Sequence, residues 1–187
     1  MELKQSITRT TFLLIVTCFC FTGFSQSSNE SHSNPFEYKW LNKKFPLDSL
    51  ISYDNDTLII SENHKHYVIN FWFTNCPPCL AEIKWLNKLK KDYQSSELEF
   101  LAVSFESKEI LDIFLETHNF EFKQFYLEQK KINENLLTIG YPTTIILDQN
   151  KKVLFQKSGG PDNQEAAQEI YQILSEEIEK MGLKKVK

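Results

Sequence analysis

The chain of 187 residues carries a formal net charge of −4, and 41% of its residues are hydrophobic and 25% charged. These proportions are typical of a folded globular domain and exclude the weakly hydrophobic, highly charged composition of a disordered chain. Bidentate contacts to guanine and phosphate favour arginine, and Arg9 is the only arginine of the sequence, so we predict no nucleic-acid binding.

The first 25 residues have the pattern of a secretory signal peptide. Two cationic side chains precede an apolar run over residues 11–24, which is shorter than the ~20 residues that a membrane-spanning helix needs. Gly23 and Ser25 then supply the small residues that a signal peptidase recognises. We therefore predict export to the periplasm or cell envelope with cleavage of residues 1–25; a retained membrane anchor and a lipoprotein are the alternatives.

The four cysteines point to reactive or metal chemistry, because they are too few for a small domain held together by disulfides alone. Cleavage of the signal peptide would remove Cys18 and Cys20. The exported chain would keep Cys76 and Cys79, so its cysteine chemistry would depend on this one pair.

After the signal peptide the sequence predicts a flexible polar linker (26–39) and one α/β domain (40–187). Near-continuous apolar runs indicate buried strands, and apolar residues repeated every three or four positions indicate helices. The expected strands are 45–52, 57–60, 66–73, 98–105, 122–127, 143–148 and 151–156. The expected helices are 78–93, 107–118, 131–137 and a last one that ends at Gly182.

Turn and cap residues define the borders of these elements. Residues 53–56 and 148–150 have turn chemistry and predict two β-hairpins. Ser107 is expected to cap the second helix, and Asp162 or Asn163 the last one. The order of strands and helices predicts a single domain with a mixed sheet.

The motif Cys76-Pro77-Pro78-Cys79 lies where a buried strand passes into a helix. The N–H groups and partial positive charge of a helix N-terminus stabilise a thiolate, the form of cysteine that attacks disulfides. Cys79, about one turn further on, can reach the sulfur of Cys76 and resolve a mixed disulfide. The spacing therefore favours thiol-disulfide exchange.

Three other interpretations of the pair remain open. A structural zinc site needs four ligands, and the candidates His64 and His66 are expected at the far end of the strand, ~23 Å away at ~3.3 Å per residue. A purely structural disulfide would close only a short loop and add little stability. A copper carrier would use both thiolates together with a donor such as His118 or Met181.

Two segments, NFWFTNCPPCLAE (70–82) and GYPTTIILDQNKKV (140–153), resemble exported thiol-disulfide oxidoreductases of the TlpA/ResA type. The resemblance covers residues 45–181. It implies a thioredoxin fold with a central mixed β-sheet flanked by helices, an N-terminal β-hairpin and an αβ insertion before the cis-proline loop.

The resemblance also implies roles for individual residues. Cys76 would be the attacking thiol and Cys79 the resolving one, with Glu82 managing a proton and Pro142 as the cis-proline. The substrate-binding positions would be Asn75, Pro77, Tyr141 and Gly159. No cofactor or metal is implied beyond the redox-active Cys76–Cys79 pair.

The sequence departs from the family pattern at two positions. Asn70 stands where thioredoxins have a buried aspartate, which puts more weight on Glu82 as proton acceptor. Asn75 replaces the usual tryptophan before the first cysteine, which predicts a less apolar contact surface there.

The resulting hypothesis is an exported, monomeric enzyme that reduces disulfides of envelope proteins and is re-reduced by a membrane electron donor. Apocytochrome c, and hence cytochrome c maturation, is the substrate that the resemblance favours. A disulfide oxidase or isomerase on the same fold is the enzymatic alternative, because known CxxC proteins span about −270 to −120 mV. A metal carrier or a binding module is the non-enzymatic one.

Overall fold

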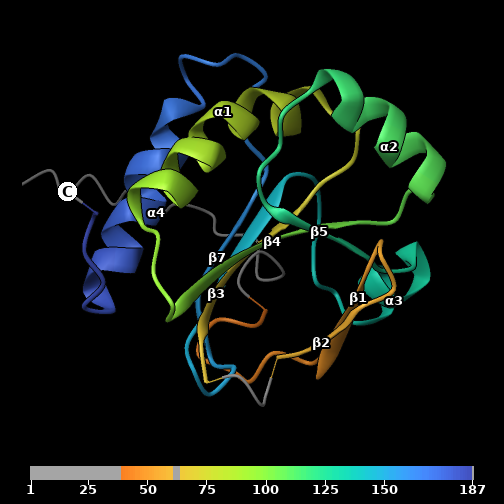
Figure 1. Cartoon of the computed structure of the whole chain (residues 1–187). Helices are drawn as coiled ribbons and strands as arrows, with labels where there is room; N and C mark the ends of the chain where they lie inside the picture. The colour runs from red at the N-terminus through yellow and green to blue at the C-terminus, as the bar shows by residue number, and fades with distance from the viewer. Residues whose placement is uncertain (1–38, 61–63, 187) are drawn as a thin grey trace, which may run out of the picture. The chain divides into compact units, whose positions relative to one another are not determined.

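The computed structural model describes residues 39–60 and 64–186 (Figure 1). The signal peptide expected at 1–25, and the linker expected at 26–39 apart from its last residue, lie outside the described residues. No helix in the described ranges is long and apolar enough to cross a membrane.

Seven described strands form one mixed sheet in the order β2-β1-β5-β4-β3-β6-β7. β3, β4 and β5 run parallel to one another, whereas β6 and β7 pair antiparallel on one side and β1 and β2 on the other. The strands are β1 (Ser49–Ser52), β2 (Thr57–Ile59), β3 (His66–Phe71), β4 (Leu98–Ser104), β5 (Lys123–Tyr126), β6 (Thr143–Leu147) and β7 (Val153–Ser158). The predicted mixed sheet and both hairpins are confirmed.

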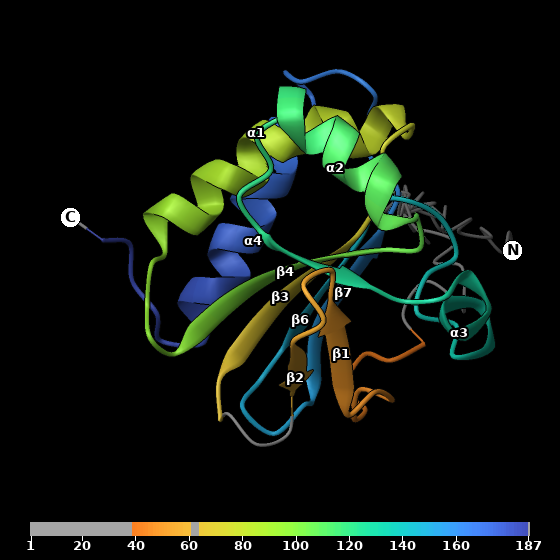
Figure 2. The same cartoon turned by 45° about the vertical axis from the view of Figure 1, so that its right-hand side comes forward.

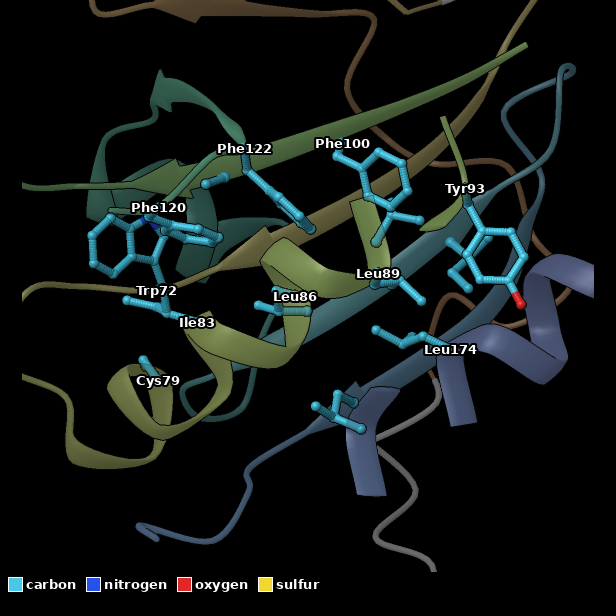
Figure 3. Packing of buried hydrophobic residues seen from close by; sticks show 14 of the residues in the cluster. Trp72, Cys79, Ile83, Leu86, Leu89, Tyr93, Phe100, Phe120, Phe122 and Leu174 are labelled. Carbon is cyan, nitrogen blue, oxygen red and sulfur yellow. The ribbon is translucent and has the colours of Figure 1, made fainter. Parts of the chain in front are cut away.

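Three helices cover one face of the sheet: α1 (Pro77–Asp92), α2 (Lys108–Thr117) and α4 (Gln168–Lys180) (Figure 2). The apolar side of α1 packs against strand residues on the sheet and against α4, as Figure 3 shows for Leu86, Leu89 and Leu174. Trp72 is completely buried here, with ring centroids 5.2 Å from Phe114 and 5.1 Å from Phe120. This core fixes the start of α1 relative to α2.

The other face is covered by the segment before β1 and by α3 (Gln129–Glu134) with the loop that follows it. Phe45, Ile132 and Leu137 are buried there against alternate residues of the central strands. The central strands are therefore buried on both faces, which explains why they read as near-continuous apolar runs in the sequence.

The predicted start of the last helix is wrong. The last helix begins at Gln168 instead of after Asp162 or Asn163, because the Asn163 side chain accepts the N–H of Ala166 and closes a separate turn. Ser107 stands at the N-cap of α2, as predicted, although its side chain makes no capping hydrogen bond. Gly182 follows the end of α4 with φ +86, as expected for a C-terminal cap.

Candidate functional site: a buried disulfide and its carboxylates

The turn between β3 and α1 places Cys76 at the N-cap of the helix. Its backbone is extended (φ −114, ψ 100), and Pro77 and Pro78 occupy the first helical positions. Proline suits these positions because their N–H groups have no partner within the helix. The helix α1 therefore begins immediately after Cys76, in agreement with the strand-to-helix junction predicted at this motif.

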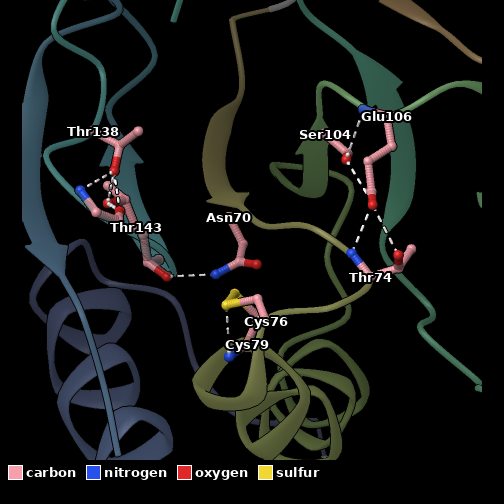
Figure 4. The surroundings of a disulfide bond; sticks show 10 residues. Asn70, Thr74, Cys76, Cys79, Ser104, Glu106, Thr138 and Thr143 are labelled. Carbon is pink, nitrogen blue, oxygen red and sulfur yellow. Dashed lines mark hydrogen bonds between the residues drawn. A yellow bond between two sulfur atoms is a disulfide. The ribbon is translucent and has the colours of Figure 1, made fainter. Parts of the chain in front are cut away.

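Cys76 and Cys79 are joined by a disulfide (Figure 4). The backbone N–H of Cys79 donates a hydrogen bond to Cys76 Sγ at 3.3 Å. Both residues are almost fully buried, with 3% and 2% of their surfaces exposed. A thiolate at Cys76 would keep this N–H donor and the positive end of α1, which is the environment that lowers the pKa of a cysteine.

Glu82 lies one turn beyond Cys79 on the same helix and is 1% exposed. Within the described part of the chain its Oε2 has no hydrogen-bond partner. Burial raises the pKa of the Glu82 carboxyl from 4.5 to about 8, and the positive charge of Lys157 opposes part of this rise. Glu82 is therefore protonated at neutral pH in the disulfide form and holds one exchangeable proton near the cysteines.

A glycine loop between β7 and α4 approaches Glu82 closely. A Cβ on Gly160 would lie 2.6 Å from Glu82 Oε1 and 3.7 Å from Pro142 Cγ, so only glycine fits without displacement. Gly159, which the family resemblance assigned to substrate binding, has φ +77 and donates its N–H to the Pro142 carbonyl at 2.7 Å. Gly160 was missed, although the Gly-Gly pair was the available signal.

The peptide bond between Tyr141 and Pro142 is cis, as the resemblance implied. The Tyr141 ring packs edge-on against Phe73, with centroids 5.3 Å apart, and against Phe105 at 5.8 Å. Its hydroxyl shares a hydrogen bond with the Gln129 side chain. These two ring contacts and the hydrogen bond to Gln129 hold the Tyr141 side chain in place.

Asn70, the residue that replaces the thioredoxin aspartate, is 1% exposed. Its Nδ2 donates to Thr144 Oγ1 on the neighbouring strand β6 at 3.0 Å. The asparagine amide cannot accept and release a proton as a carboxyl does. Asn70 therefore bridges two strands beneath the site and leaves the proton chemistry to another group.

A second carboxyl group near the cysteines was not predicted. Glu106, just after β4, accepts the backbone N–H of Thr74 at 2.7 Å and the Thr74 hydroxyl at 2.8 Å (Figure 4). The Tyr53 hydroxyl donates to the Glu106 carbonyl at 2.8 Å. These bonds hold the loop two residues before Cys76 in place.

Asn75 and Pro77, the other two predicted substrate contacts, are exposed on either side of Cys76. Asn75 also lines a hollow of about 430 Å³ that extends over α2. No group of three or more His, Cys, Asp and Glu side chains that could hold a metal ion occurs in residues 39–60 and 64–186.

Comparison with known proteins supports this description. Over 89 residues, the chain is 36% identical to the thioredoxin-like protein YneN of Bacillus subtilis, a match that covers 46% of this chain and 51% of YneN. Over 103 residues, it is 29% identical to the thiol-disulfide oxidoreductase ResA of Oceanobacillus iheyensis, covering 54% of this chain and 53% of that protein. The matches thus span about half the length of these relatives.

The structure is similar to that of a Chlorobium tepidum protein described as a candidate thiol:disulfide interchange protein DsbE. The TM-score is 0.64 at 21% identity, over 75% of this chain and 96% of that one, which shows a common fold. Residues 42–156 match the AhpC/TSA family. The chain therefore belongs to the AhpC/TSA family and has the thioredoxin-like fold.

Proposed function

We propose that the protein is an exported thiol-disulfide oxidoreductase that reduces disulfides of other proteins through Cys76 and Cys79. The observation that carries this proposal is the Cys76–Cys79 disulfide at the N-terminus of α1, one turn from the buried, protonated Glu82. The names of the relatives YneN and ResA support the same chemistry. Export rests on the signal-peptide pattern of residues 1–25.

The reaction begins with the reduced protein. The Cys76 thiolate attacks one sulfur of a substrate disulfide; that S–S bond breaks, and the other substrate sulfur leaves as a thiolate that takes a proton from water. Cys79 then attacks Cys76 Sγ, the mixed disulfide breaks, and the second substrate thiolate leaves and is protonated. Two electrons have passed to the substrate, and Cys76 and Cys79 are joined.

Glu82 supplies the proton step that Cys79 needs. The Cys79 thiol must lose its proton before it can attack, and Glu82 accepts this proton in the fraction of molecules whose carboxyl group, with a pKa of about 8, is ionised. The product is a neutral carboxyl beside a disulfide, which is the state that the raised pKa of Glu82 favours. In this proposal Pro142 and the Tyr141 backbone border the site where an extended substrate segment lies.

Each reaction cycle leaves the protein oxidised, so a membrane electron donor of dithiol type must reduce it again. Exported proteins with disulfides, including apocytochrome c, form the proposed substrate class. An oxidase would use the same residues in the opposite direction, and the reduction potential of the pair distinguishes the two.

Equilibration with glutathione buffers, followed by thiol trapping, measures this potential. Cys18 and Cys20 are replaced by serine so that only Cys76 and Cys79 are counted. We expect a potential near the reducing end of the known range, about −270 mV. A value near about −120 mV would contradict the reductase direction, and a disulfide that no buffer reduces would overturn the enzymatic function altogether.

Single cysteine variants test the order of attack. Cys79→Ser is expected to accumulate a mixed disulfide with a substrate protein, because the resolving thiol is missing, whereas Cys76→Ser should trap none. Mass spectrometry of the non-reduced adducts measures both. Adducts on Cys79 alone would reverse the assigned roles, and stoichiometric copper binding without any adduct would favour a metal carrier.

A further inference from the structure

A hollow lies directly beside the cysteine motif on the side of α2. Its volume is about 430 Å³, and Thr74 and Asn75 line it at one edge and Ile110 and Ile113 at the other. Asn75 is the neighbour of Cys76 in the chain. A molecule seated in this hollow, which we name the α2 hollow, would therefore lie against the loop that leads into the attacking cysteine.

The α2 hollow is bordered by two exposed isoleucines that the fold itself does not need. Ile110 and Ile113 are 48% and 68% exposed, and they lie three positions apart on one side of the helix. The core-facing side of α2 is formed by Leu111 and Phe114. Exposed apolar side chains are common singly, but two adjacent ones beside a reactive pair indicate a contact surface.

The residues that line the α2 hollow include His118 and no acidic side chain; the nearest acidic residues of α2 lie beside Ile113, next to it in the chain or one turn away. Glu109, Asp112 and Glu116 are exposed on α2, and the only exposed cation of the helix, Lys108, is paired with Asp112 at 2.9 Å. Thr74 and Asn75 at the opposite edge are uncharged. An occupant that complements this surface carries an apolar side chain together with lysine or arginine.

We propose that the α2 hollow binds the disulfide-bearing segment of the substrate protein and selects segments in which an apolar residue is flanked by lysine or arginine. This proposal rests on the thiol-disulfide exchange proposed above and names the class of its substrates. Docking there brings the segment to the Asn75 side of Cys76. The acidic side chains of α2 beside Ile113 attract a basic segment and slow the approach of an acidic one.

Three disulfide-linked peptides of equal length test the selection. They share one apolar residue next to the cysteine and differ only in two flanking residues, which are lysine, glutamine or glutamate. The reduced protein, with Cys18 and Cys20 replaced by serine, is mixed with each peptide at low and at high salt. We expect rate constants in the order lysine, glutamine, glutamate, with about tenfold between the extremes at low salt and less at high salt.

Variants of the α2 hollow connect this preference to its residues. Ile113→Ser should slow all three peptides several-fold, and the double variant Asp112→Lys, Glu116→Lys should reverse the order of lysine and glutamate peptides. Ile51→Ser, at another exposed isoleucine on β1, is the control for Ile113→Ser. The double variant Glu169→Lys, Glu176→Lys on α4 changes the net charge by the same amount as the α2 double variant. Neither control should change the rate constants or their order. Circular dichroism checks that every variant is folded.

The small uncharged substrate 2-hydroxyethyl disulfide distinguishes the two proposals. Its reduction should be the same in all these variants, because it is too small to bridge the hollow. If it is not reduced at all, the proposed function fails. If it and the three peptides are reduced but the peptides do not differ, or if the α2 variants behave like the controls, the docking proposal fails alone. If the protein forms dimers in solution and Ile113→Ser dissociates them, the hollow binds a second copy of the chain, and the docking proposal fails as well.

Discussion

Two glutamates lie near the disulfide, and they are held in opposite ways. Glu106 is half-buried, and its oxygens accept hydrogen bonds from the backbone and hydroxyl of Thr74. Glu82 is buried at 1% exposure, and within the described residues its Oε2 has no partner. One carboxyl group organises the loop before Cys76, whereas the other is kept neutral by burial.

The difference shows that proximity to a reactive pair does not define a proton carrier. A buried carboxyl group without donors is stabilised in its neutral form. Burial raises the pKa of Glu82 to about 8, so this group can take up a proton near neutral pH. The following variants test this contrast, beginning with the largest expected effect.

Replacing Glu82 by glutamine should change how stability depends on pH. In the wild type the folded-state pKa of about 8 lies above the ordinary 4.5, so the folded protein retains a proton that the unfolded chain loses. Between these values stability falls as pH rises, by up to about 5 kcal/mol at about 1.4 kcal/mol per pH unit. Urea unfolding from pH 4 to 9 should show this fall in the wild type and not in Glu82→Gln.

The control for this experiment is Glu176→Gln on the exposed surface of α4, which should follow the wild-type curve. A constant offset between Glu82→Gln and wild type is expected from the new amide, because its protons need buried acceptors. Parallel curves over the whole pH range would contradict the assignment of a raised pKa to Glu82.

Replacing Glu106 by alanine should act through lost hydrogen bonds. The Thr74 N–H and hydroxyl lose their acceptor, and we expect a loss of about 1–3 kcal/mol in the free energy of unfolding. The reduction potential of the pair should change as well, because the loop before Cys76 is released. Denaturant unfolding and glutathione equilibration measure the two effects. An unchanged free energy of unfolding would show that Glu106 does not stabilise the loop before Cys76.

Gly160→Ala tests how tightly the glycine loop covers Glu82. The added Cβ would lie 2.6 Å from Glu82 Oε1, so the carboxyl group or the loop has to move, and we expect a loss of about 1–3 kcal/mol. Gly140→Ala is the matched control, because a Cβ there meets nothing within 4 Å. Equal stabilities of the two variants would show that the loop is free to withdraw from Glu82.

Removal of the charge on Lys157 should have the smallest effect. Its ammonium lowers the pKa of Glu82, so Lys157→Met should raise that pKa further and move the pH-dependent fall in stability to higher pH. Lys157→Arg keeps the charge and should leave the fall near its wild-type position. The same unfolding series measures both variants, and a fall that moves to lower pH in Lys157→Met would contradict the attraction.

The sequence predicted the parts of this site that are local in the chain. The cysteine motif, the strand before it and the helix after it form one continuous pattern, and Pro142 and Gly159 could be placed by resemblance. Glu106 could not be found in this way, because it lies 32 residues from Thr74 and meets it only through the pairing of β3 with β4.

Burial was equally hidden from the sequence. A glutamate on an amphipathic helix reads as a solvated side chain, and only the packing of α1 against the sheet and of the glycine loop over it shows that Glu82 is enclosed. The border of the last helix failed for a similar reason. Asn163 has the side chain of a helix cap, and the structure uses it in a turn five residues earlier than the helix.

The central claim is that the disulfide form keeps a proton on Glu82. Carbon-13 NMR of protein labelled in the glutamate carboxyl carbons, assigned by comparison with Glu82→Gln, measures the titration of this one group with the Cys76–Cys79 disulfide intact. The account predicts a midpoint of about 8. A midpoint near the ordinary value of 4.5 would contradict it, because Glu82 would then be charged at neutral pH like any solvated carboxylate.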